Sequence, residues 1–312
     1  MRKNLLLTVL LTGMMGTAMA QKDNLEDMLE DKDAPKKKDF VTATFKATRI
    51  ISSSSVENLG QGTLDFRISH RFGLLNQGYE NTYGLDGATT HLALDYGIKP
   101  WLMVGIAHSG FLKEDDGFAK VKILRQVKHG MPITLSYMGS VSVQTTPAPT
   151  LPSVDSNKWF LSNRFYYCNQ ILIARKFSDA ISIQIMPTMV HYNLVDSSKF
   201  SNNTFAIGIG GRVKLNKRIA ITGEYYYRLT NADMTVAGEK TYNALSLGVD
   251  IETGGHVFQL MLTNSQGMTD RTYIAQTATN WADGGIRLGF NISRIFAIVK
   301  PKEFRGKEAD KW

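Results

Sequence analysis

Residues able to carry out chemistry are few in this chain and lie far apart. The six histidines, at positions 70, 91, 108, 129, 191 and 256, form neither an HExxH motif nor a close pair, which argues against a zinc site. The single cysteine, Cys168, excludes an internal disulfide framework and an all-cysteine metal site. We therefore expect neither a metal nor a cofactor.

Two further patterns could suggest catalysis. Gly208, Gly210 and Gly211 resemble a phosphate loop, but no Gly-Lys-Ser/Thr follows them, so we interpret them as small residues that let a strand curve. His108-Ser109 is the one candidate pair for a hydrolase acting at a lipid-facing surface. Neighbouring strand residues point to opposite faces, which argues against their cooperation. We predict no enzyme and no catalytic residue, and rank a hydrolase third among the functions considered.

The elements that position the side chains are strands, because apolar and polar residues alternate with a period of two from residue 62 onward. Residues 64–69, Leu-Asp-Phe-Arg-Ile-Ser, are typical. The pattern predicts strands near 63–72, 90–98, 101–110, 118–127, 131–144, 160–176, 180–191, 204–215, 218–229, 242–251, 256–264 and 284–296.

The gaps between these strands alternate between long and short. Long gaps fall at 73–89, 111–117, 145–159, 192–203, 230–241 and 265–283, and short ones at 99–100, 128–130, 177–179, 216–217 and 252–255. Transmembrane barrels have short periplasmic turns and longer outer loops, and backbone in lipid must be paired in a closed sheet. The sequence predicts an all-β fold, an antiparallel up-and-down transmembrane barrel of about 12 strands over 62–298. A soluble lipocalin-like or sandwich protein fits the alternation poorly.

Composition and the N-terminus predict export. The chain has 312 residues, 43% hydrophobic and 21% charged, with a net charge of +8, which is typical neither of a disordered chain nor of a helical membrane protein. Residues 1–20 resemble a signal peptide, with Arg2 and Lys3 before an apolar run and Ala18-Met19-Ala20 at its end. Residues 21–39 hold seven acidic and five basic residues and are expected to form a flexible periplasmic leader without nucleic-acid binding.

Strand parity then assigns side chains to the two faces of the barrel. The charged and histidine residues expected to line the lumen are Asp65, Arg67, Arg71, His91, Asp95, Lys120, Lys122, Arg212, Glu224, Arg228, Asp250 and Arg287. Leaving the histidine aside, they comprise seven cations and four anions, which would favour small anionic solutes in an open channel. The alternative is a salt-bridge network that fills a narrow barrel. The aromatic residues expected at the membrane interfaces are Trp101, Trp159, Phe177, Tyr192, Phe205, Tyr227, Tyr242 and Phe296.

Several stretches resemble a known family. They are Thr48–Ile51, Ser55–Glu57, Gly62–Gly73, Leu85–Thr89, Leu94–Ile98, Leu102–Ile106 and Ile173–Ser178, of which Gly62–Gly73 is the most specific. The chain is similar, over roughly 45–298, to a family of membrane-bound β-barrels of unknown function from Bacteroidetes-type bacteria. This resemblance implies an outer-membrane barrel and no particular activity or site residue.

Two segments keep open interpretations. Residues 40–61 alternate and then reach the Ser52–Ser55 run, so they could form a periplasmic strand, an extra barrel strand or a lumen plug. Residues 299–312 form a charged tail. We expect a bacterial outer-membrane barrel with both termini in the periplasm, in contact with lipid and the barrel-assembly machinery. It would be a passive small-solute channel or a closed structural barrel whose loops, especially 265–283, contact other molecules.

Overall fold

The computed structural model describes residues 39–146, 160–195, 199–236 and 239–299. Within them, twelve antiparallel strands form one closed barrel, which confirms the fold that the alternating pattern predicts. Each strand pairs with the wall strands before and after it, and β1 closes the barrel against β14. The wall strands are β1 (Thr63–Leu74), β2 (Ala88–Lys99), β3 (Leu102–Ser109), β4 (Glu114–Leu124), β5 (Thr134–Gln144), β6 (Phe165–Lys176), β7 (Ile181–Tyr192), β8 (Asn203–Lys214), β9 (Ile219–Arg228), β12 (Leu245–Thr253), β13 (His256–Thr263) and β14 (Arg287–Ala297).

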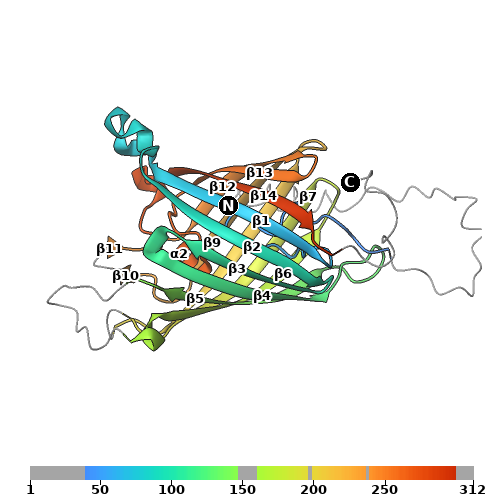
Figure 1. Ribbon diagram of the computed structural model, residues 1–312, viewed down its shortest axis with the longest axis horizontal. Helices are drawn as coiled ribbons and strands as arrows, with labels where there is room; N and C mark the ends of the chain where they lie inside the picture. Colours follow the sequence, from blue (N-terminus) through green and yellow to red (C-terminus); the bar gives the residue numbers. More distant parts are fainter. Residues whose placement is uncertain (1–38, 147–159, 196–198, 237–238, 300–312) are drawn as a thin grey trace, which may run out of the picture. The chain divides into compact units, whose positions relative to one another are not determined.

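The connections at the two ends of the barrel differ in length. We call one end the turn end, with connections at 100–101, 125–133, 177–180, 215–218 and 254–255. The other is the loop end, where the pair β10 (Thr235–Val236) and β11 (Glu239–Lys240) and the helix α2 (Asp270–Ala275) lie (Figure 1). Short 3-10 turns occur at Leu75–Gln77, Tyr79–Gly84, Phe111–Lys113, Leu161–Arg164 and Trp281–Asp283. Among the residues described here, no helix is long and apolar enough to cross a bilayer.

Strand bounds differ from the predicted ones mainly at the loop end. β4 begins at Glu114, four residues earlier than predicted, because Glu114 pairs with Gln144 of β5. β6 begins at Phe165 because Leu161–Arg164 forms a 3-10 turn. At the turn end, β5 begins only after Pro132, which has no backbone N–H to donate to a neighbouring strand. These shifts alter which charged residues belong to the wall.

The two faces of the wall follow the alternation along each strand. On β1, Asp65, Arg67 and Arg71 are buried, while Phe66 lies on the outer surface. On β7, Ile181, Ile183 and Ile185 are all exposed on the outside. The apolar face is therefore outside and the polar face inside, the reverse of a soluble barrel.

The inside of the barrel is occupied by two parts of the chain. We name residues 44–59 the lumen segment; its Phe45, Ile50, Ile51, Val56 and Leu59 are each at most 4% exposed. We name residues 264–277 the α2 loop; all the residues of α2 except Asp270 at its start are fully buried. In Figure 1, α2 is drawn within the outline of the barrel near its loop end, and it contacts β6 and β9.

Candidate functional site: the filled lumen

The lumen segment is a tight hairpin whose two ends lie at the turn end of the barrel. Arg49 and Ser54 form an antiparallel bridge, and the backbone N–H of Ser55 donates to the carbonyl of Thr48 at 2.9 Å. Before the segment, the N–H of Val41 donates to the carbonyl of Gln126 in the 125–133 turn. After it, residues 60–62 lead into β1. Residues 50–53 form the tip, which is closed by a hydrogen bond from the N–H of Ile50 to the carbonyl of Ser53 at 2.8 Å.

The tip is held by one carboxylate of the wall. Glu224, on β9, is 2% exposed and accepts the backbone N–H groups of three consecutive tip residues. The distances are 3.2 Å from Ile51, 2.7 Å from Ser52 and 3.1 Å from Ser53. Successive N–H groups that converge in a turn form an anion-binding concavity, and here the anion is a side chain of the same protein. The buried charge of Glu224 is thereby balanced by hydrogen bonds.

A lysine on the opposite side of the hairpin contacts carbonyl groups. Lys120, on β4, is fully buried, and its Nζ donates to the carbonyls of Ser55 at 2.9 Å and Glu57 at 2.6 Å. On β1, Arg67 donates to Thr48 at 3.2 Å and to Asp95 at 2.9 Å. Wall charges thus contact both the donors and the acceptors of the hairpin.

The α2 loop is fixed by a second set of buried charges. The Arg271 guanidinium lies against the Glu114 carboxylate, and its Cζ is 3.7 Å from the centre of the Tyr166 ring. Thr269 also donates to Glu114, at 2.6 Å. Asp270 accepts from Ser140 of β5 at 2.8 Å. The loop is therefore tied to β4, β5 and β6.

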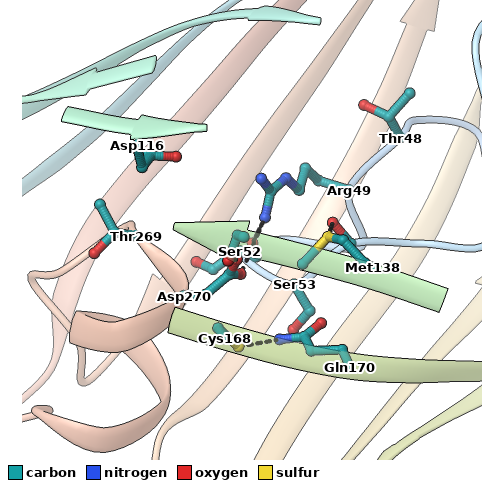
Figure 2. A network of polar contacts seen from close by, with 12 residues as sticks. Thr48, Arg49, Ser52, Ser53, Asp116, Met138, Cys168, Gln170, Thr269 and Asp270 are labelled. Carbon is teal, nitrogen blue, oxygen red and sulfur yellow. Dashed lines mark hydrogen bonds and ion pairs between the residues drawn. The ribbon is translucent and has the colours of Figure 1, made fainter. Parts of the chain in front are cut away.

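The lumen segment and the α2 loop also meet each other. Arg49 reaches from the segment toward Asp270, with 3.4 Å between Nη1 and Oδ1, and donates to the carbonyl of Ser52 at 3.0 Å (Figure 2). Two cavities beside these contacts have volumes of only about 10 Å³ each. A single water needs about that much space. The two parts of the chain therefore pack closely against the wall and against each other.

A wider hollow lies at the turn end, outside this packing. Its volume is about 690 Å³, and it is lined by Asp39–Thr42, parts of the 125–133 turn and residues 175–179. Lys128 in this turn lies 2.9 Å from the Asp39 carboxylate, whose hydrogen bond and charge raise the pKa of the lysine. The hollow marks where the chain enters the lumen.

Most residues predicted to line the lumen are buried in the structure. Those at most 5% exposed are Asp65, Arg67, Arg71, His91, Asp95, Lys120, Arg212, Glu224, Arg228 and Asp250. Lys122 and Arg287 are half-buried. The structure brings many of these side chains onto the lumen segment and the α2 loop rather than around an open pore.

Sequence reasoning missed two carboxylates of the wall. Glu114 is fully buried, and Asp116 accepts a hydrogen bond from His91 at 3.0 Å. Both precede the predicted start of this strand at residue 118, so they were not assigned to a face. Their charges reduce the excess of cations from which an anion preference was predicted.

Tyr192 is a correction to the predicted interface aromatics. It is 1% exposed and lies edge-on to Tyr166 inside the barrel, with ring centres 5.5 Å apart. It shares the parity of the buried Met186 and Val190 on β7, so it points inward. Of the other predicted aromatics, Trp101, Phe177, Phe205, Tyr227 and Phe296 are exposed, Tyr242 is half-buried and Trp159 lies outside the described residues.

The candidate pair for catalysis is split between the two faces. Ser109 is 1% exposed and donates to the carbonyl of Phe111, whereas His108 lies outside and contacts Asp115 at 2.6 Å. In the part of the chain that the structure covers, no group of three or more His, Cys, Asp or Glu side chains is placed to hold a metal ion.

The interpretation of the glycines on β8 also changes. An added methyl group at Gly210 would lie 2.5 Å from Cδ1 of Ile50. At Gly208 it would lie 2.6 Å from the Tyr226 ring. These glycines make room for side chains inside the lumen, in addition to any effect on strand curvature.

Comparison with known families adds an identity to this architecture. Residues 45–296 match the family described as "Membrane bound beta barrel domain (DUF5777)". The chain belongs to this family. It is therefore a membrane-bound β-barrel, and the apolar outer surface, including Ile171, Ile183 and Leu247, contacts lipid. The match includes the lumen segment from Phe45 onward, so the segment is part of the family domain.

Comparisons with solved structures and with curated proteins add less to this description than the family match does. The chain is similar to the NanC porin, with 11% identity, a TM-score of 0.46, and coverage of 74% of this chain and 98% of that one. It is also similar to an outer membrane channel from Pseudomonas putida F1, with 12% identity, a TM-score of 0.47, and coverage of 77% and 98%. Likenesses at this level concern the barrel fold alone. No curated protein matches the chain.

Proposed function

We propose that the protein is an outer-membrane barrel closed by its own chain, and that it passes small solutes only after two internal layers move. The lumen segment forms one layer and the α2 loop forms the other. The observation that supports the proposal is the tip hairpin, which lies inside the wall on Glu224 and Lys120. Both layers combine packed apolar side chains with polar and ionic contacts, and the polar groups can exchange their partners for water when the layers leave.

The remaining parts of this proposal come from the sequence. Residues 1–20 would direct export, residues 21–39 would form a periplasmic leader, and both termini would lie in the periplasm. Residues 1–38 and 300–312 lie outside the described residues. The barrel-assembly machinery would insert the barrel, in a bacterium of the Bacteroidetes type. Of the loop 265–283, through which a closed barrel would contact other molecules, residues 271–275 are buried in the barrel, whereas Ala278, Ala282 and Asp283 are exposed and would form the contact.

Single-channel recording tests the proposal with four barrels. The first barrel has an intact chain. The second carries a protease site inserted between the exposed Gly60 and Gln61; it is cut after folding and then washed to remove the cut segment. The other two carry Arg271→Met in addition, which frees the α2 loop. We expect discrete conductance steps only from the cut barrel with Arg271→Met. A gel band shift on heating verifies that each barrel is folded.

Two outcomes would contradict the proposal. Steps from the intact barrel would show that the packed lumen conducts, which would refute closure. Silence from the cut Arg271→Met barrel, with loss of the segment verified by mass spectrometry, would refute solute passage and leave a closed structural barrel.

Lys122 tests whether charges of the wall contact the solute. Its side chain is 14% exposed and its Nζ lies 4.0 Å from the Glu57 carboxylate of the lumen segment, so removal of the segment exposes it. In the conducting cut barrel, Lys122→Glu should shift the reversal potential in a salt gradient toward cations. Lys128→Glu, at the exposed turn, is the matched control and should shift it less. An unchanged reversal potential in Lys122→Glu would refute its place along the solute path.

A further inference from the structure

The hydrogen bonds from the wall to the lumen segment go mainly to its backbone; at the tip, Arg71 also donates to the hydroxyl of Ser52 at 3.1 Å. Gln184 of β7 accepts from the N–H of Val56 at 2.9 Å and donates to the carbonyl of Ser54 at 2.7 Å. This pair of bonds copies what a neighbouring strand would provide to an extended chain. Backbone groups are the same in every peptide, so such contacts do not depend on the sequence that occupies the site.

Two further amides extend this pattern to the carbonyl groups of the tip. Gln259 of β13 donates to the carbonyl of Ile50 at 2.7 Å, and Asn291 of β14 donates to that of Ile51 at 2.8 Å. Asn291 also donates to Gln259 at 2.9 Å, which orients both amides toward the tip. With Glu224 on the N–H groups and Lys120 on later carbonyls, the wall satisfies donors and acceptors along residues 50–57.

At the tip, the side chains of the two isoleucines pack over glycines of the wall. Cδ1 of Ile50 lies over Gly210 of β8, where an added methyl group would come within 2.5 Å of it. Cδ1 of Ile51 lies over Gly248 of β12, where an added methyl group would come within 3.2 Å. Both isoleucines are 1% exposed. Gly210 thus makes room for Ile50 beside Met186, and Gly248 makes room for Ile51 beside the Thr222 hydroxyl and the Leu260 carbonyl, at adjacent positions of the occupant.

We infer that the lumen wall is a peptide-binding site, with the lumen segment as its built-in occupant. Its ligand class is a peptide turn with two adjacent aliphatic residues followed by small polar ones, as in Ile50–Ser53. The wall binds the backbone of such a turn, and Gly210 and Gly248 select its aliphatic side chains. The inference rests on the proposed function in one respect, because a second peptide can bind only after the segment has left.

Peptide exchange into the cut and washed barrel tests the inference. The probe is a fluorescent synthetic peptide of residues 44–59, and its binding is followed by fluorescence anisotropy in detergent. We expect saturable binding, at least tenfold weaker for a peptide with Ile50→Asp and Ile51→Asp. A peptide that keeps residues 48–57 between unrelated flanks should bind within tenfold of the original. Failure of that peptide would restrict the site to the chain's own segment and overturn the inference.

Pairing Gly210→Ala in the barrel with Ile50→Val in the peptide separates a specific contact at Gly210 from a general loss of peptide binding. In the full-length Gly210→Ala barrel, cut after folding, the added methyl group meets Cδ1 of Ile50, an atom that valine lacks. The original peptide should bind at least tenfold more weakly to this barrel, and a peptide with Ile50→Val should recover most of the loss. Equal weakening of both peptides, or of neither, would refute the specific contact at Gly210.

The anisotropy readout is independent of conduction. If the cut barrel binds the peptide but stays silent even when it also carries Arg271→Met, solute passage is refuted and the peptide site stands. If the cut Arg271→Met barrel conducts but the cut barrel does not bind the peptide, the site is refuted and the channel stands.

Discussion

Replacing Glu224 by alanine is expected to release the lumen segment from an otherwise folded barrel. The substitution leaves the N–H groups of Ile51, Ser52 and Ser53 without their acceptor inside the lumen. An unsatisfied buried donor costs about 1–3 kcal/mol, so three of them weaken docking by about 3 kcal/mol or more. That corresponds to a rise of roughly 100-fold in the undocked population.

Trypsin cleavage after Arg49 measures this release. Arg49 is 8% exposed in the closed barrel, so the protease reaches it only when the hairpin leaves the lumen. We expect cleavage of Glu224→Ala at least tenfold faster than that of the unsubstituted protein, with the gel band shift of the folded barrel retained. Mass spectrometry of the released fragment distinguishes this cut from one after the more exposed Lys46.

Glu252→Ala is the matched control. Glu252 lies on β12 and forms a 2.6 Å ion pair with Lys46, but both side chains are about one third exposed. Exposed ion pairs contribute only about 0–1 kcal/mol, so this variant should be cleaved at nearly the unsubstituted rate. Equal rates for Glu224→Ala and the unsubstituted protein would show that Glu224 does not hold the segment. Equal acceleration in both alanine variants would show that any lost carboxylate loosens it.

The strands of the wall and the faces of their side chains could be predicted because the alternation that specifies them involves only neighbouring residues in the sequence. A period of two places Asp65 and Arg67 on one face and Leu64 and Phe66 on the other, whatever the rest of the chain does. The errors arose where a strand boundary was misplaced, as at Glu114, or where parity was not applied, as at Tyr192. In both cases the neighbouring strand residues carried the signal that would have corrected the assignment.

The filling of the lumen depends on contacts that no local pattern contains. Glu224 and Ser52 are 172 residues apart in the chain, and Arg271 and Glu114 are 157 apart. The alternation in residues 41–48 is equally consistent with a strand, so the sequence left open whether this stretch joins the wall or enters the lumen. The α2 loop lies within a long gap between predicted strands, and nothing in its polar sequence distinguishes a buried loop from an exposed one.

Breaking the pair between Arg271 and Glu114 should cost more than removing any other single ion pair discussed here. Glu114 is fully buried on β4, and among the residues that the structure describes, Arg271→Met leaves its carboxylate with the 2.6 Å hydrogen bond from Thr269 alone. Loss of one partner from a buried pair typically costs about 3–5 kcal/mol. We expect the α2 loop to undock and the temperature of the gel band shift to fall.

The double variant Glu114→Gln with Arg271→Met decides whether the cost comes from the stranded charge. Glutamine keeps an acceptor for Thr269 but carries no charge, so the double variant should recover much of the stability that Arg271→Met loses. Arg287→Met is the control, because Arg287 is half-buried and its one bond to the described residues is a donation to the carbonyl of Phe72. Additive losses in the double variant would place the contribution of Arg271 in its packing on Tyr166 instead. Recovery would mean that the lost stability comes from the unpaired charge of Glu114. Undocking of the α2 loop would then require that Glu114 and Arg271 both become hydrated.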